Sequence, residues 1–357
     1  MVAICPTNNE IWIFETKGSP DISKWTKIQT LKEHFNTITA LEWHPTTHLL
    51  LSASADRGVI VWKKEGDEFM PQLGMIKEQR ANLDGAWNTR GDKFAIASST
   101  GCVYVGTYFA QNNFWVAHTV SKSSNKPIHK ASAICVKFDP PSSRVVLSSS
   151  LDGTVQITSC YNKDLDKESA GPFGGITSYG EQLMSISCNG WVNYAAFSPS
   201  ATQICFITHD CEVNFANVEQ NAKDPKAKPN AEKIMHTGNP HLHCIFISED
   251  KCLASGYDKV PFLYEKKGDK WEMKQSLDKG IANQKKTKIG GNSFKDKKVY
   301  FNSDFKLDAK VEMKESDTMH SNYINGLKIF ARDGDKLKAI CTSDINGSLN
   351  YWDLTSV

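Results

Sequence analysis

The sequence predicts an all-β fold, a seven-bladed β-propeller, on three observations. Six segments share one order: an apolar strand ending in an aromatic residue, a polar turn, a second strand, a short polar turn and a third strand. The strands are rich in Val, Ile, Phe and Tyr, and the turns in Asn, Asp, Gly, Pro and Ser. The aromatic markers are spaced by 44, 51, 59, 49 and 84 residues: Trp43, Trp87, Phe138, Phe197, Phe246 and Phe330. A blade of four short strands takes roughly 40 to 45 residues, which fits this period.

The first blade is predicted to be incomplete. Residues 3–15, AICPTNNEIWIFE, match the middle of a repeat, with Phe14 where the clearest repeat has Trp62. The following stretch, KWTKIQTLKEH, supplies the outer strand of that partial unit. The strand that would close the ring is not visible: the chain starts downstream of the usual beginning, a partner supplies the strand, or the first blade is thin. Six full repeats and one partial repeat therefore make one predicted domain over residues 1–357.

An insertion is predicted before the last blade, because the final spacing leaves about 40 residues beyond one blade. We place it at 279–322. From Lys279 to Val299 it carries seven lysines against one acid, Asp296. Two interpretations are open. The insertion is either a solvated loop without a partner or a binding arm for an acidic protein surface. The candidate contact residues are Phe294, Lys295, Lys297 and Lys298.

An Asp recurs 12 to 14 residues after the aromatic marker in five repeats: Asp56, Asp152, Asp210, Asp258 and Asp344. A short carboxylate at this turn can accept hydrogen bonds from the turn backbone. Two repeats add a His upstream and a Trp downstream of the Asp, namely His34, Asp56 and Trp62, and His320, Asp344 and Trp352. Ser, His and Asp also build acyl-transfer sites, but an enzyme needs one such constellation. Repetition therefore favours a structural role and predicts no catalytic residues.

Composition narrows the functions further. Lys and Arg total 42 against 40 Asp and Glu, so a net charge of +2 directs the protein to neither nucleic acid nor an anionic membrane. No stretch approaches the roughly 20 apolar residues that span a bilayer, so we expect no membrane insertion. Ten cysteines without a Cys-x-x-Cys pair indicate buried free thiols in a reducing cytosol.

For one cluster of cysteine and histidine, a metal site is the alternative to buried free thiols. It would use His241, His243 and Cys244. In a regular strand, however, the two histidines share one face while Cys244 points to the other. Structural zinc normally takes four ligands, and no second ligand pair lies nearby in the sequence. We therefore expect no metal and no cofactor.

The repeat resembles the WD40 family, in which His, a strand Ser, Asp and Trp form a structural hydrogen-bonded set. That resemblance implies Ser52 or Ser54 as the serine of the first full repeat. More specific text resembles the propeller subunits of actin-related protein 2/3 complexes, in blade order over nearly the whole chain. It includes AICPTNNEIWIFE, QNNFWVAH at 111–118, CNGWVNYAAFSPSATQICFITHD at 188–210 and HSNYINGLKIF.

This resemblance implies a non-catalytic scaffold that supports nucleation of branched actin filaments in the cytoplasm, at the actin cytoskeleton. The implied partners are two actin-related proteins, the other subunits of the complex, nucleation-promoting factors and the actin filament. The family's lysine-bearing insertion reaches toward the mother filament, and 279–322 matches it in position. The alternative is a WD40 adaptor of a ubiquitin ligase or a vesicle coat, and an enzyme or nucleic-acid binder ranks last.

Overall fold

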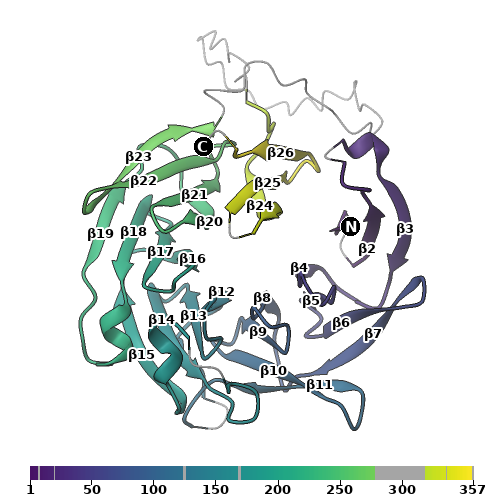
Figure 1. Cartoon of the computed structure of the whole chain (residues 1–357), viewed down its shortest axis with the longest axis horizontal. Helices are drawn as coiled ribbons and strands as arrows, with labels where there is room; N and C mark the ends of the chain where they lie inside the picture. Colours follow the sequence, from purple (N-terminus) through teal and green to yellow (C-terminus); the bar gives the residue numbers. More distant parts are fainter. Residues whose placement is uncertain are drawn as a thin grey trace, which may run out of the picture.

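The protein is a ring of β-sheets around a central opening, as the computed structural model shows (Figure 1). The structure describes residues 1–6, 9–19, 21–123, 126–167, 170–277, 318–334 and 336–355. Its strands form six sheets, of which one has eight strands and contains two blades. The all-β class and the seven blades predicted from the repeat are therefore confirmed.

The first and last blades each contain three described strands. Blade 1 orders β1 (Val2–Ile4), β2 (Ile11–Glu15) and β3 (Thr26–Leu31), with the short 3-10 helix η1 (Ile22–Lys24) before β3. Blade 7 orders β24 (Ile324–Asp333), β25 (Lys336–Asp344) and β26 (Leu349–Asp353). Within the described ranges the incomplete first blade is as predicted.

Blades 2 and 3 form the eight-stranded sheet. Blade 2 is made of β4 (Ile38–Trp43), β5 (Leu50–Ser54), β6 (Val59–Glu65) and β7 (Glu68–Met75). Blade 3 is made of β8 (Asn82–Trp87), β9 (Lys93–Ser98), β10 (Val103–Phe109) and β11 (Phe114–Thr119). The outer strands β7 and β11 pair in parallel where Trp115 meets Gly74 and Val116 meets Met75. This junction joins the two blades, and the repeat pattern did not predict it.

Blades 4 to 6 are separate four-stranded antiparallel sheets. Blade 4 holds β12 (Ala133–Phe138), β13 (Val145–Ser150), β14 (Thr154–Cys160) and β15 (Tyr179–Ser187). Blade 5 holds β16 (Val192–Phe197), β17 (Gln203–Thr208), β18 (Glu212–Asn217) and β19 (Ala231–Met235). Blade 6 holds β20 (His241–Ser248), β21 (Lys251–Gly256), β22 (Phe262–Lys267) and β23 (Lys270–Ser276). Two 3-10 helices accompany them, η2 (Pro172–Gly175) and η3 (Glu219–Ala222).

The core lies between neighbouring blades. Every residue of β5, β9 and β13 is buried, because a second strand is covered by a blade on each face. Leu51 of blade 2 and Phe94 of blade 3 belong to one apolar cluster with Trp87. Adjacent blades therefore share their hydrophobic contacts, and the ring is stabilised blade against blade.

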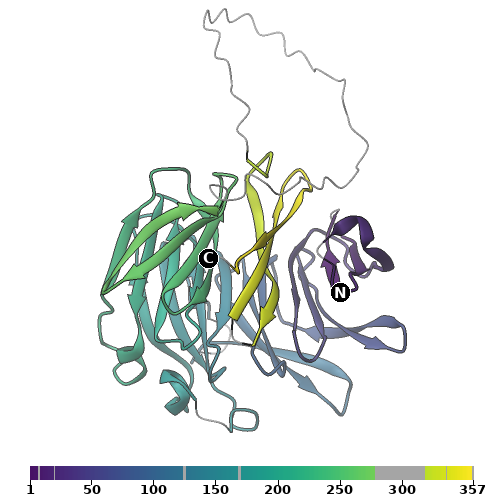
Figure 2. The ribbon, with the colours of Figure 1, turned by 45° about the horizontal axis from the view of Figure 1, so that its top comes forward.

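Side chains close the ring between the last blade and the first two. The ring of Phe330 on β24 stacks on that of Trp25 with centroids 6.3 Å apart. Lys328 Nζ lies 3.7 Å from a carboxylate oxygen of Glu42 on β4. Figure 2 shows the last blade standing beside the first. Residues 279–317 of the predicted insertion lie outside the described residues.

No helix among the described residues is long and apolar enough to cross a membrane.

Candidate functional site

The predicted repeat set is complete in blade 2. His34 precedes β4, and its Nδ1 lies 3.1 Å from an Asp56 carboxylate oxygen. Its Nε2 lies 2.8 Å from the hydroxyl of Ser52, and Trp62 Nε1 donates to the same hydroxyl at 2.9 Å. Ser52 is therefore the serine of the set. Ser54, the other candidate, donates to the backbone of Asn36 instead.

Burial and hydrogen bonds shift the pKa values of His34 and Asp56 in this set. Burial lowers the pKa of His34, and the Asp56 carboxylate only partly opposes this. Burial of Asp56 opposes its ionisation, but hydrogen bonds from Phe35 N and Gly58 N outweigh burial and hold its pKa below the usual value. Ser52 is 0% exposed, so no substrate can reach its hydroxyl. A buried and hydrogen-bonded set of this kind fits the structural role that its repetition predicts.

Blade 7 repeats the arrangement with one substitution. His320 Nδ1 lies 3.1 Å from Asp344, and its Nε2 lies 2.6 Å from the hydroxyl of Thr342. Trp352 Nε1 donates to that hydroxyl at 2.7 Å. A threonine thus takes the place of the serine. His320 belongs to this set, so the end of the predicted insertion is already part of the last blade.

Blade 4 contains a histidine that sequence reasoning missed. His129 Nδ1 lies 3.4 Å from Asp152, and its Nε2 lies 2.8 Å from the Ser148 hydroxyl. The signal was spacing: His129 stands 23 residues before Asp152, as His34 stands 22 before Asp56. Thr158 occupies the tryptophan position, and its hydroxyl is buried without a partner among the described residues.

Blades 3 and 5 keep only fragments of the set. In blade 5, Asp210 accepts a hydrogen bond from the hydroxyl of Thr208, and among the described residues no histidine is bonded to it. In blade 3 the carboxylate comes from the loop before β8 instead of from the β9–β10 turn. Glu78 stands 22 residues before Thr100, at the histidine position, and accepts from the Thr100 hydroxyl at 2.9 Å. The acid missing from the Ser98–Gly101 turn is thus supplied by the preceding loop.

Blade 6 has the most altered set. Asp258 lies 2.6 Å from Nε2 of His236, a second histidine that the sequence did not single out. Tyr264 stands where blade 2 has Trp62, and its hydroxyl lies 3.3 Å from His236 Nδ1 and 2.9 Å from His241 Nε2. The ring centroids of the two histidines are 4.3 Å apart.

The three residues weighed for a metal site have separate neighbours. His243 is not part of the blade 6 set. Its Nε2 lies 3.0 Å from the Asn325 carbonyl oxygen. The Cys244 thiol faces the Cys205 carbonyl oxygen at 3.8 Å. The expectation that His241 and His243 share one face was wrong, because β20 shifts register between them at a bulge.

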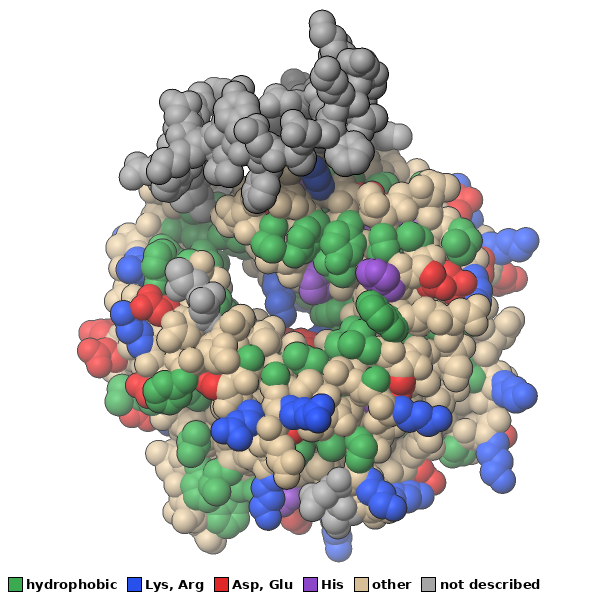
Figure 3. All heavy atoms as spheres, turned by 180° about the vertical axis from the view of Figure 1, so that it is seen from behind, with side chains coloured by type: hydrophobic (Ala, Val, Ile, Leu, Met, Phe, Trp, Pro, Cys, Tyr) green, Lys and Arg blue, Asp and Glu red, His purple; other side chains and the backbone are tan. Residues whose placement is uncertain are grey.

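The loops on the same side of blades 5 to 7 carry a row of aromatic rings. Its ring centroids are 5.3, 6.4 and 5.1 Å apart along Trp191, His209, Tyr257 and Tyr323. Trp191 is 53% exposed. Figure 3 shows hydrophobic side chains and histidines gathered beside the central opening. Such a surface suits a protein partner.

The corresponding loops of blades 2 to 4 are basic. Six exposed cations lie in the β5–β6, β7–β8 and β11–β12 connections: Arg57, Lys77, Arg80, Lys122, Lys126 and Lys130. Of these, Lys122 is paired with Glu181. The exposed cations make this part of the face complementary to an acidic segment.

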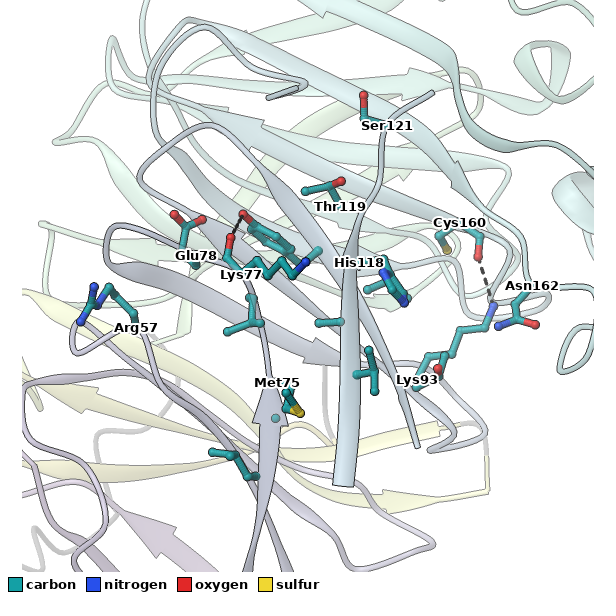
Figure 4. Close-up of a pocket in the computed structure, with 18 of the residues that line it drawn as sticks. Arg57, Met75, Lys77, Glu78, Lys93, His118, Thr119, Ser121, Cys160 and Asn162 are labelled. Carbon is teal, nitrogen blue, oxygen red and sulfur yellow. Dashed lines mark hydrogen bonds between the residues drawn. The ribbon is translucent and has the colours of Figure 1, made fainter. Parts of the chain in front are cut away.

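A cavity of about 1010 Å³ lies where β7, β11 and the end of β14 meet. Figure 4 shows Met75, Lys77, His118 and Asn162 around it, from three different blades. The amino group of Lys93 at its edge is committed to the Asp166 carboxylate and to backbone oxygens, including Cys160 O at 3.4 Å. No nucleophile–base pair forms among the described residues that line the cavity.

The predicted partner-binding residues Phe294, Lys295, Lys297 and Lys298 lie outside the described residues, so their role stays a prediction.

Comparison with known proteins gives one family and several full-length relatives. The WD domain, G-beta repeat, family matches residues 25–63 and 123–159. The chain is 26% identical over its whole length to actin-related protein 2/3 complex subunit 1A-B of Xenopus laevis, covering 91% of that protein. It is 25% identical to subunit 1A of Arabidopsis thaliana over its whole length and 92% of the relative. It is also 25% identical to subunit 1 of Schizosaccharomyces pombe, over 97% of this chain and 92% of the relative.

Proposed function

Because this chain is a homologue of actin-related protein 2/3 complex subunit 1 along its full length and carries WD repeats, we propose that it is the scaffold subunit of that complex. The observation that carries the proposal is the extent of the match, which covers all of this chain and 91% of the first relative. A non-catalytic role agrees with the buried hydroxyl of Ser52. The protein would support nucleation of branched actin filaments by holding its partners in place.

The geometry supports such a role through rigidity. Buried histidine–aspartate pairs fix the loops of four blades, so the residues carried on those loops are held in place before a partner arrives. The aromatic row and the basic loops then offer two different surfaces on one face. We propose that the aromatic row contacts another subunit and that the basic loops receive an acidic segment of a nucleation-promoting factor. The protein acts in the cytoplasm, at the actin cytoskeleton.

We further propose that the 279–322 insertion contacts the mother filament. The support is its charge, seven lysines against one acid between Lys279 and Val299, opposite an acidic protein surface. The test replaces Phe294, Lys295, Lys297 and Lys298 together by Ala and measures binding of the assembled complex to preformed filaments by co-sedimentation. Filament binding should weaken by about tenfold, while assembly of the complex is unchanged.

A matched control changes three other exposed lysines, Lys122, Lys126 and Lys130, to Ala. This control should leave filament binding intact and weaken the response to a nucleation-promoting factor. Unchanged filament binding in the insertion variant would make the segment a linker.

The main proposal is tested by removing this protein from a cytosolic extract and measuring actin assembly from dispersed monomers. Branched nucleation should be lost, and adding back the complex that contains the chain should restore it. Normal branching in the depleted extract would favour the alternative, an adaptor of another cytosolic assembly.

A further inference from the structure

Blade 6 gathers three side chains that can ligate a metal. Each of His236, His241 and Asp258 offers a ligand atom, and these atoms all lie within 4.8 Å of one another. Both histidines are buried, with 6% and 2% exposure, and the side chain of Asp258 is 14% exposed. The cluster is therefore mostly shielded from water but reachable through the carboxylate.

Comparison with the other blades shows that His241 is a departure from the repeat. It pairs with Gly256, two residues before Asp258, just as Ile38 pairs with Ser54, two residues before Asp56. The residues in the same pairing position of blades 4 and 5 are also apolar, Ala133 and Val192, and blade 3 has Asn82. A buried imidazole thus stands where three other blades place an apolar side chain. Packing alone gives no reason for it.

The hydrogen bonds of the cluster leave one nitrogen without a partner. His236 Nε2 donates to the Asp258 carboxylate, which also accepts from the Asn239 backbone. His236 Nδ1 can then only accept, so the Tyr264 hydroxyl donates a hydrogen bond to it. The hydroxyl oxygen of Tyr264 in turn accepts from His241 Nε2. This order leaves the lone pair of His241 Nδ1 buried, and among the described residues Nδ1 has no hydrogen-bond partner.

The serine of the set is also absent here. Ala254 stands four residues before Asp258, where Ser52 stands four before Asp56. In blade 6 the hydroxyl that contacts the histidine therefore comes from Tyr264 instead of a strand serine, and a second imidazole contacts the same hydroxyl. Two imidazoles and a carboxylate are the donor set of many zinc sites, with water in the fourth position.

We propose that His236, His241 and Asp258 form a binding site for a divalent transition-metal ion, with Zn²⁺ as its natural occupant. The ion takes one nitrogen from each histidine and one oxygen from Asp258. Binding through His236 Nε2 moves the proton of this neutral imidazole to Nδ1, so no proton is lost from the ring. Zinc–ligand bonds of about 2.0 to 2.2 Å require the three donors to close in from their present separations, through rotation of the side chains. The site would fix the β21–β22 turn beside Tyr257 of the aromatic row. It does not depend on the proposed function.

The test titrates the full chain, freed of metal with a chelator, with Zn²⁺ in a calorimeter. Co²⁺ serves as a spectroscopic probe of a site with nitrogen and oxygen donors. The diagnostic variant is His241→Ile, which restores the residue type of Ile38 and should fold. Asp258→Asn is a second variant, because it keeps the shape of the turn and removes the charge. His209→Ala is the matched control, an exposed histidine in the β17–β18 turn outside the cluster.

The expected result is one Zn²⁺ per chain in the unchanged protein and in His209→Ala. Affinity should fall by on the order of tenfold or more in His241→Ile and in Asp258→Asn. The Co²⁺ spectrum should disappear in the same two variants. No stoichiometric binding by the unchanged chain, or binding that His241→Ile leaves intact, would overturn the proposal.

Discussion

Two neighbouring serines of blade 4 are both fully buried but differ in what they touch. The Ser148 hydroxyl is bonded to His129 Nε2 at 2.8 Å. The Ser149 hydroxyl has no partner among the described residues. Removing Ser148's oxygen leaves a buried imidazole nitrogen unpaired, whereas removing Ser149's oxygen leaves nothing unpaired. Comparing the two serines therefore tests whether the hydroxyl bonded to the histidine stabilises the fold more than an unbonded hydroxyl on the same strand.

We predict that Ser148→Ala lowers the free energy of unfolding by about 1 to 3 kcal/mol. Ser149→Ala, the matched control, should leave it unchanged or raise it slightly, because an unsatisfied polar group is removed. Equilibrium unfolding in urea, followed by tryptophan fluorescence, measures both. Equal losses in the two variants would contradict a specific role for the histidine–aspartate set.

Acidification should weaken the same sets. Burial lowers the pKa of His34, His129 and His320, and the neighbouring carboxylates only partly oppose it. Below about pH 6.5 the unfolded chain therefore binds more protons than the folded one, so stability falls as pH falls. The aspartates, whose pKa values are also lowered, add a loss only below about pH 4.

We accordingly expect the free energy of unfolding to decrease between pH 7 and pH 5. The decrease can reach about 1.4 kcal/mol per pH unit for each buried histidine. Chemical denaturation at several pH values measures the slope. A stability that rises toward pH 5 would mean that these imidazoles gain protons on folding, contrary to the burial described here.

At the residue scale, sequence reasoning identified the sets of blades 2 and 7 because Trp62 and Trp352 mark them. It missed His129 and His236, which stand at the right distance before an aspartate but lack a tryptophan after it. Glu78 was hidden for another reason. Its spacing to the turn is the usual one, but a glutamate stands at the histidine position and Thr100 at the aspartate position, so neither residue type marks the set.

Among the elements, one contact locks blade 3 to blade 4. Asp166, in the segment after β14, lies 2.5 Å from Lys93 Nζ of β9 and 2.5 Å from a guanidinium nitrogen of Arg90. Lys93 and Asp166 have fully buried side chains, and Lys93 also donates to the backbone of Ser143. A lone lysine within an apolar strand gives no sign of a partner 73 residues away, so this lock could not be predicted from the sequence.

Asp166→Ala should destabilise the protein by about 3 to 5 kcal/mol, because it leaves the Lys93 ammonium buried without its counter-charge. Glu65→Ala is the control, since Glu65 pairs with Lys63 on the same strand, β6, where both side chains are exposed, and should contribute less than about 1 kcal/mol. Thermal unfolding compares the two. Similar small shifts in both variants would show that Lys93 finds other partners or water.

The strands were predicted better than their assembly into sheets. Apolar runs and polar turns located the blades, because a second strand covered on both faces must be apolar throughout. The parallel junction of β7 and β11 was not predictable, since it pairs only two residues on each strand. The bulge between His241 and His243 likewise follows from the pairing with β21 and leaves no mark in the strand's own sequence.

At the scale of the whole molecule, the repeat spacing and the residues of the turns predicted the ring. Local sequence segments outside the repeat consensus predicted the family. Neither prediction depends on contacts between residues that are far apart in the sequence. The closing contacts, Trp25 with Phe330 and Glu42 with Lys328, join residues about 300 positions apart and needed the fold to be seen. The ring they complete presents loops from successive blades on one face, which is the geometry that a scaffold requires.

The central claim is that this protein is a stoichiometric subunit of an actin-related protein 2/3 complex. The most direct measurement is to tag the chain, isolate it at native abundance from the cells that produce it, and quantify what co-purifies by mass spectrometry. We predict two actin-related proteins at one copy each per chain, with the remaining subunits of the complex. Recovery of the chain without them, alone or with subunits of a ubiquitin ligase or a vesicle coat, would contradict the account.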